Sequence, residues 1–148
     1  MKILHISDFH LSNDDVNIQK SQRIVNSLIE ALDRVQQDNT IDLVIFSGDA
    51  INKGGAGFDS LEDAFLSFQT ILIEPLMAKL NLSKDKFVWC IGNHDIDRNL
   101  DSKYLEAGIN EKLKTLRDVD DFFNNNDGMD VKRIAPFKKY EKEFYVNN

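Results

Sequence analysis

Three short apolar runs, each stopped by small or polar residues, constrain the fold of this chain more than any other feature. They are Ile3 to Ile6, Leu43 to Phe46 and Phe87 to Ile91. Apolar runs of this length, bounded by turn formers, are typical of strands buried in a parallel sheet. We therefore expect three buried parallel strands.

Two segments with helical periodicity separate these runs. Ile18 to Gln37 places apolar residues on one face and charged residues on the other. Ser60 to Leu80 carries a second apolar stripe and begins with Ser60 and Asp63 in the spacing of a capping box. Pro75 is expected to kink this helix or to divide it in two. The alternation of strands and helices predicts an α/β fold with a mainly parallel sheet and flanking helices.

Beyond the third run, the periodicity indicates two further helices. Residues 102–123 predict one helix that is weakened at Gly108, and Asn124 to Gly128 reads as a loop. Pro136 to Tyr145 predicts a last helix with three aromatic residues on one side and lysines on the other. The 148 residues contain no clear linker, so we expect one domain.

Charge and composition exclude several classes of protein. The net charge of -7 opposes non-specific attraction to duplex DNA or to an anionic membrane surface. No segment approaches the length of a membrane span, and the first apolar run is too short for a signal peptide, so we expect no membrane association and a cytoplasmic location. The single cysteine, Cys90, excludes a disulfide framework, and we expect it to be a small buried residue.

Residues that can bind metal follow each of the three predicted strands. They are Asp8 and His10 after the first, Asp49 after the second, and Asn93, His94 and Asp95 after the third. Since the carboxyl ends of parallel strands meet at one edge of a sheet, we expect these residues to lie together. Asp8 and His10 are two positions apart, which in extended backbone directs both side chains to one side. Each residue alone could be a turn former or a surface histidine, but together they predict a metal site.

Three motifs match the successive blocks of calcineurin-like metallophosphoesterases in order and spacing: Asp8-Phe9-His10, Gly48-Asp49 and Gly92-Asn93-His94-Asp95. The first hundred residues resemble this family, including the start of its cyclic-nucleotide phosphodiesterases and of its Mre11-type nucleases. The resemblance implies an α/β/β/α sandwich, of which this chain would form the first half. It also implies hydrolysis of phosphodiester or phosphomonoester bonds by a two-metal mechanism.

The resemblance further implies a role for each metal-site residue. Asp8 and His10 would hold the first metal, Asp49 would bridge both metals, and Asn93 would bind the second. Ligands that mix carboxylate, amide and imidazole groups suit Mn²⁺ first, with Fe, Zn or Mg as alternatives. The implied partner is a phosphoester substrate, with nucleotides among the candidates.

The same resemblance implies catalytic roles for His94 and Asp95. His94 would stabilise the transition state or protonate the leaving oxygen. Asp95 would accept a hydrogen bond from His94 and fix its tautomer. His5 lies within the first strand, opposite in parity to the ligands, and is expected to be a hydrogen-bonded core or interface residue.

The histidines that the family contributes after these motifs have no counterpart here, because the chain contains only His5, His10 and His94. We therefore expect residues 1–148 to form a single metallophosphoesterase domain that is truncated on its C-terminal side. Such a domain would hold one metal well and the other poorly, and its activity alone would be weak or absent. It would also expose one face of the sheet, which favours self-association.

Two alternatives to a phosphoesterase of small substrates stay open. One is a regulatory or binding module that keeps the scaffold without turning over substrate, and the other is a Mre11-type nuclease domain. The basic residues near the end of the chain alternate with Glu141 and Glu143, which is typical of a solvated helix face. Nucleic acid is therefore a possible partner but not the favoured one.

Overall fold

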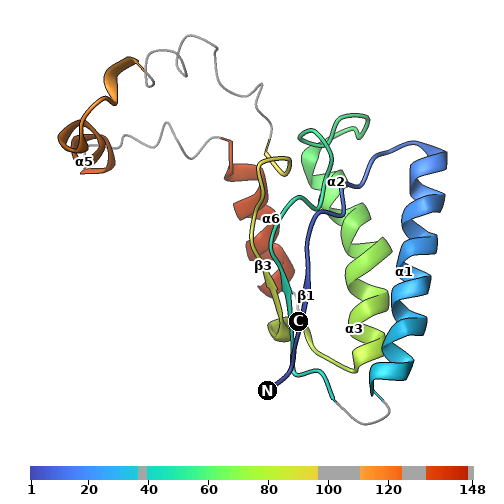
Figure 1. Cartoon of the computed structure of the whole chain (residues 1–148). Helices are drawn as coiled ribbons and strands as arrows, with labels where there is room; N and C mark the ends of the chain where they lie inside the picture. The colour runs from blue at the N-terminus through green and yellow to red at the C-terminus, as the bar shows by residue number, and fades with distance from the viewer. Residues whose placement is uncertain (37–39, 97–110, 125–132, 147–148) are drawn as a thin grey trace.

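The computed structural model describes residues 1–36, 40–96, 111–124 and 133–146. The strands are β1 (Ile3–Ile6), β2 (Leu43–Phe46) and β3 (Phe87–Trp89) (Figure 1). The helices are α1 (Asp15–Gln36), α2 (Leu61–Phe68), a π-helical segment (Gln69–Ile73), α3 (Glu74–Leu80), a short 3₁₀ turn (Lys84–Lys86), α5 (Leu116–Asn124) and α6 (Ala135–Val146).

The three strands form one parallel sheet in the order β1-β2-β3. Ile3 pairs with Leu43, and Val44 pairs with Phe87, so the pairing begins at or next to the first residue of each strand. Parallel strands need crossover connections, and α1 and the α2–α3 segment supply them. The predicted α/β fold with a parallel sheet and flanking helices is confirmed.

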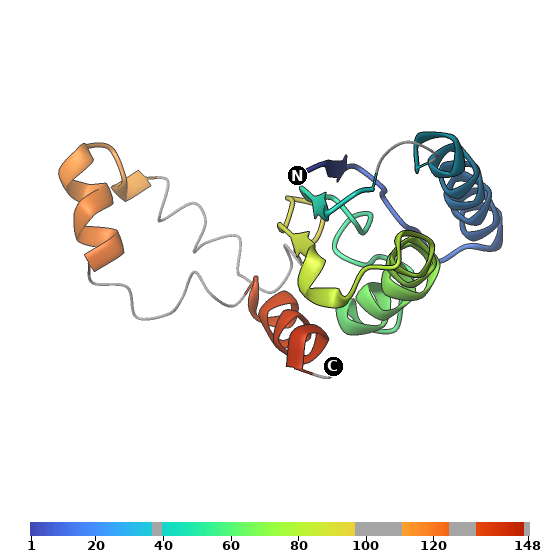
Figure 2. The same cartoon turned by 90° about the horizontal axis from the view of Figure 1, so that it is seen from below.

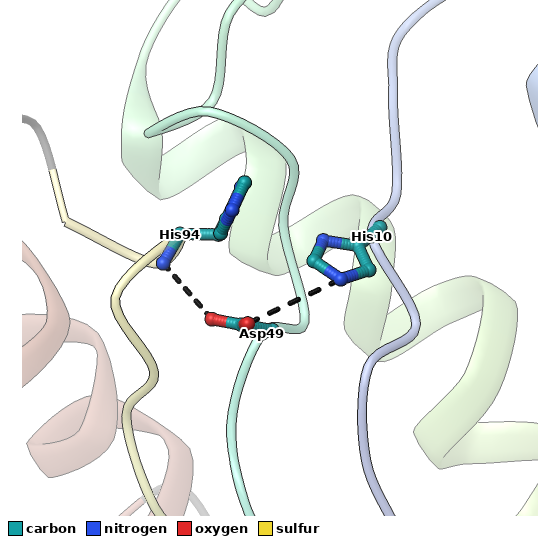
Figure 3. Close-up of side chains that lie close together, drawn as sticks. All are labelled: His10, Asp49 and His94. Carbon is teal, nitrogen blue, oxygen red and sulfur yellow. Dashed lines mark hydrogen bonds and ion pairs between the residues drawn. The ribbon is translucent and has the colours of Figure 1, made fainter.

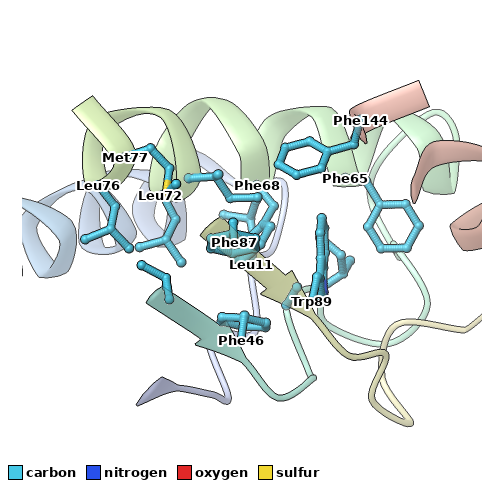
Figure 4. Packing of buried hydrophobic residues seen from close by; sticks show 14 of the residues in the cluster. Leu11, Phe46, Phe65, Phe68, Leu72, Leu76, Met77, Phe87, Trp89 and Phe144 are labelled. Carbon is cyan, nitrogen blue, oxygen red and sulfur yellow. The ribbon is translucent and has the colours of Figure 1, made fainter. Parts of the chain in front are cut away.

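One face of the sheet is covered by helices and carries the core. Helices α1, α2, α3 and α6 lie on the same side of the strands (Figures 1 and 2). Phe46, Phe87 and Trp89 point from the sheet into this layer, where aromatic rings from α2 and α6 meet them edge-on or tilted (Figure 4). Burial of these large rings stabilises the contact between the sheet and the helices and helps to fix the orientation of β2 and β3.

The opposite face of the sheet is much more open. Ile3 and Val88 remain 45% and 41% exposed, and Ile45, which pairs with Val88, is half-buried. The prediction of fully buried strands is therefore correct for one face only, since no described helix packs on the other. The prediction that Cys90 is buried is wrong: it is exposed, directly after β3. Self-association through this face stays a prediction.

The second helical segment begins and divides as its sequence indicated. Ser60 is in extended conformation, and its hydroxyl accepts a hydrogen bond from the backbone N–H of Asp63 at 3.0 Å. The π-helical turn Gln69–Ile73 then separates α2 from α3, just before Pro75. Because proline has no N–H to donate and its ring crowds the preceding turn, the wider turn accommodates it without ending the helix.

The C-terminal predictions have mixed outcomes. Helix α6 is confirmed, and its residues Phe137, Tyr140 and Phe144 are buried. The prediction of one continuous helix over 102–123 is wrong, because the chain is not helical at 113–115 and a new helix begins at Leu116, capped by Thr115. Asn124, predicted as the first residue of a loop, is the last residue of α5, and the rest of that loop lies outside the described residues, as do residues 97–110. Among the described helices, none is long and apolar enough to cross a membrane.

Candidate metal centre

The backbone after β1 and the backbone after β2 run side by side beyond the sheet. Asp8 N–H donates to the carbonyl of Gly48 at 3.1 Å, and His10 N–H donates to the carbonyl of Asp49 at 2.9 Å. A parallel bridge between Leu11 and Ile51 continues the pairing. These hydrogen bonds hold the first two motifs at the same edge of the sheet, as their position after parallel strands predicted.

Three candidate ligands adopt a backbone conformation that side chains rarely take. Asp8, His10 and Asp49 have φ angles of 58°, 52° and 58°, and they make up three of the five non-glycine residues with positive φ in the described parts of the chain. Such conformations cost about 1 kcal/mol or more each and cluster at functional sites. The extended backbone that we assumed for Asp8 and His10 is therefore wrong, although the two side chains still meet.

His10, Asp49 and His94 form the metal-binding group: each offers an atom that could ligate an ion, these atoms all lie within 4.8 Å of one another, and no other such cluster is found among the described residues (Figure 3). Nε2 of His10 is 4.0 Å from Oδ2 of Asp49. The rings of His10 and His94 meet edge-on, with centroids 4.8 Å apart. Two imidazoles and a carboxylate at such spacing, all partly buried, can be reached by one small divalent cation.

Two glycines allow the close approach that orients Asp49. The turns after β2 and β3 pack so tightly that a Cβ on Gly48 would lie 2.8 Å from Cα of Gly92. A Cβ on Gly92 would lie 2.2 Å from Oδ1 of Asp49. That oxygen accepts a hydrogen bond from the backbone N–H of His94 at 2.9 Å, which leaves Oδ2 directed toward His10.

Asp8 and Asn93 lie at the same edge but outside this group. Oδ1 of Asp8 is 3.7 Å from Nε2 of His10, and the Asp8 side chain is 66% exposed. Asn93 is exposed in the turn between Gly92 and His94. The positions are compatible with the metal roles implied for both residues, and those roles stay predictions.

A glycine-rich loop after β2 contacts His94, which the sequence did not reveal. The backbone N–H of Lys53 donates to Nδ1 of His94 at 3.3 Å, and the N–H of Gly54 donates to the His94 carbonyl at 2.7 Å. The run Gly54, Gly55 and Gly57, all at positive φ, was the available sign of an unusual turn. Because Nδ1 accepts this hydrogen bond, a neutral His94 ring carries its proton on Nε2.

Asp95 does not make the hydrogen bond with His94 that the resemblance implied. It is fully buried, and its oxygens accept hydrogen bonds from the backbone N–H groups of Asp49, Ile51 and Gly92, each at 2.8 Å. Burial raises the pKa of the Asp95 carboxyl, and the three backbone hydrogen bonds oppose that rise. Asp95 does not reach His94 because the two side chains face opposite sides after the turn at Gly92. His94 faces the open edge of the sheet, and Asp95 faces the interior.

His5 lies apart from the metal-binding group. Its Nε2 is 2.7 Å from the hydroxyl of Ser47, so the predicted hydrogen bond is present, but the residue is exposed rather than in the core. It belongs to the open face of the sheet.

Comparisons with known proteins agree with this geometry. The family profile described as calcineurin-like phosphoesterase matches residues 1–144. Over 104 residues, 70% of this chain and 29% of the relative, the chain is 34% identical to a cAMP/cGMP dual specificity phosphodiesterase of Mycobacterium tuberculosis (strain CDC 1551 / Oshkosh). Over 132 residues, 85% of this chain and 45% of the relative, it is 26% identical to a probable cyclic nucleotide phosphodiesterase of Xenorhabdus bovienii (strain SS-2004).

The matched part of this chain thus spans less than half the length of each of these two relatives. The family profile, in contrast, extends over nearly all of its residues, and the three motifs that predicted the family meet at one edge of the sheet. The chain belongs to the calcineurin-like phosphoesterase family.

Proposed function

We propose that this chain carries the metal centre of a phosphoesterase that hydrolyses phosphodiester bonds by a two-metal mechanism, with cyclic nucleotides as the first substrate class to test. One observation carries the proposal: turns after three separate strands bring two candidate ligands, His10 and Asp49, together with a candidate proton donor, His94, with their side-chain atoms within 4.8 Å of one another. The names of the two relatives support the choice of cyclic nucleotides. A cytoplasmic location belongs to the same proposal.

The residues present fit divalent cations of the Mn²⁺ type. Asp8, His10 and Asp49 would hold one ion, and Asp49 and Asn93 would contribute to a second. When bound, such ions polarise a phosphoryl oxygen and lower the pKa of a water molecule. Manganese is our first choice of metal, because the donors are hard oxygens mixed with imidazole nitrogen.

Asp49 is oriented for this role by its own hydrogen bonds. The N–H of His94 holds Oδ1, and Oδ2 faces His10. A carboxylate fixed in this way retains lone pairs on both oxygens, so it can contact two ions at once. The positive φ of Asp49 is the conformational cost of that orientation.

His94 would act as a proton donor rather than as a third ligand. The hydrogen bond from Lys53 N–H to Nδ1 leaves the proton of the neutral ring on Nε2. A protonated Nε2 cannot bind a metal but can donate to the leaving oxygen as the phosphoester bond breaks. His94 and Asp49 would therefore respond differently to substitution.

The test measures Mn²⁺ binding by calorimetry and hydrolysis of bis-p-nitrophenyl phosphate and of cyclic AMP. We expect the chain to bind one Mn²⁺ well and to hydrolyse slowly. Asp49→Ala should lose both Mn²⁺ binding and hydrolysis. His94→Ala should keep Mn²⁺ binding and lose hydrolysis by about 100-fold or more.

His5→Ala is the matched control, because it removes a histidine that lies outside the metal-binding group and should change neither measurement. Loss of Mn²⁺ binding in His94→Ala would show that His94 is a ligand. Hydrolysis that survives in Asp49→Ala, or that needs no divalent ion, would refute the proposed function.

A further inference from the structure

Asp95 is the one charged residue that is fully buried among the residues the structure describes. A buried carboxylate needs hydrogen-bond donors to replace water, and here the donors are all backbone N–H groups. Oδ2 accepts from Asp49 and Gly92, and Oδ1 accepts from Ile51. No side chain is needed to explain its position.

These three donors come from two different turns. Asp49 and Ile51 belong to the turn after β2, and Gly92 belongs to the turn after β3. The carboxylate of Asp95 therefore ties together the ends of two neighbouring strands. One of the three donors, Asp49, is itself a candidate ligand.

Asp49 is held at its backbone N–H and at its side-chain carboxylate. Its N–H donates to Asp95, and its Oδ1 accepts from the N–H of His94, the residue that precedes Asp95. Between these two contacts the backbone of Asp49 keeps its positive φ. An unfavourable backbone conformation persists only where the surroundings over-determine it. Asp95 supplies the constraint on the Asp49 N–H, while His94 N–H holds the Asp49 side chain and His10 N–H holds its carbonyl.

Building on the proposed function, we propose that Asp95 is a positioning residue that sets the metal affinity of the site through Asp49, without contacting metal or substrate. Its two oxygens accept three N–H groups, and only a carboxylate offers acceptors on both sides. Asparagine has the same shape, but its NH₂ group would face a backbone N–H and could not accept from it. The Asp49 backbone would then lose part of its support.

The test compares Asp95→Asn with the wild-type chain by Mn²⁺ calorimetry and by thermal unfolding without metal. We expect the dissociation constant for Mn²⁺ to rise by about tenfold or more in the folded variant, as for other groups that orient ligands. The matched control is Asp118→Asn, because Asp118 also accepts backbone hydrogen bonds, from Lys114 and Thr115, but belongs to α5. It should leave the Mn²⁺ dissociation constant unchanged.

A folded Asp95→Asn variant that binds Mn²⁺ as tightly as the wild type would overturn the inference and leave the proposed function standing. Absence of Mn²⁺ binding in the wild type would instead refute the proposed function itself. The two failures are therefore distinguishable in one set of titrations.

If Asp95→Asn does not fold, hydrogen–deuterium exchange on the wild type tests whether the Asp95 contacts are coupled to Mn²⁺ binding. Coupling is reciprocal, so if the Asp95 contacts strengthen Mn²⁺ binding, then Mn²⁺ must strengthen those contacts. Amide exchange in peptides that contain Ile51 and Gly92 should slow by about the same tenfold factor when Mn²⁺ is added. Unchanged exchange in both peptides, under conditions where Mn²⁺ is bound, would overturn the inference.

Discussion

A methyl group added at Gly92 should displace Asp49 and damage the metal centre. In Gly92→Ala the new Cβ would lie 2.2 Å from Oδ1 of Asp49 and 2.3 Å from its backbone nitrogen. Gly92 is not among the described residues with positive φ, so alanine adds little backbone strain of its own. The effect of this substitution therefore comes from the contact with Asp49.

The size of the displacement follows from that contact. Non-bonded Cβ contacts in proteins essentially never fall below 3.0 Å, so Asp49 or the turn carrying position 92 must move by about 0.8 Å. Metal–ligand distances tolerate changes of only about 0.2 Å. A misplacement near 1 Å at a reacting centre costs about 100-fold in rate. We expect Mn²⁺ affinity to fall by at least about tenfold and hydrolysis by about 100-fold.

Gly57→Ala is the control for this experiment. Gly57 has a φ of +93°, so alanine is strained there, but its Cβ would meet nothing closer than 3.7 Å. This variant should lose stability, by about 1 kcal/mol, and keep Mn²⁺ affinity. Calorimetry below the unfolding temperature of each variant separates the two effects. Equal Mn²⁺ affinity in Gly92→Ala and in the wild type would refute the packing argument.

Two further predictions concern stability. Ser60→Ala removes the hydroxyl that caps α2 and should lower the free energy of unfolding by about 1 kcal/mol in urea titrations; no change would show that the cap contributes nothing. Burial, followed by the charge of Glu74, raises the pKa of Tyr140 above its usual 10, so the stability that Tyr140 contributes is complete below pH 10 and is lost as the pH rises through its raised pKa. Tyr140→Phe should therefore lose less stability than the wild type above pH 10, and parallel losses would contradict the assignment.

The elements that could be predicted from sequence are those with a clear periodicity. The runs at Ile3, Leu43 and Phe87 gave the strands, and the capping serine and Pro75 gave the start and the division of the second helical segment. Apolar runs do not reveal which face is covered, however. Val88 and Cys90 lie in an apolar run but on the face that the described helices leave open, so their exposure could not be predicted from that run.

In the candidate site, too, some features could be predicted from the sequence and others could not. Residue types and their position after strands identified His10, Asp49 and His94 correctly as neighbours. The tautomer of His94 depends on the backbone N–H of Lys53, and the position of Asp95 depends on backbone N–H groups that include those of Ile51 and Gly92. Every residue except proline has such a group, so the residue types alone do not show which N–H groups lie near these side chains. The positive φ angles at Asp8, His10 and Asp49 were hidden for the same reason, since they arise from pairing between distant turns.

The central claim is that the turns after the three strands form a metal centre. It is tested most directly by a crystal structure of this chain grown with Mn²⁺, using anomalous diffraction to locate the ion. We expect an anomalous peak within about 2.5 Å of Nε2 of His10 and of a carboxylate oxygen of Asp49, with Nε2 of His94 beyond bonding distance. Anomalous peaks elsewhere on the protein, with none at this edge of the sheet, would contradict the account.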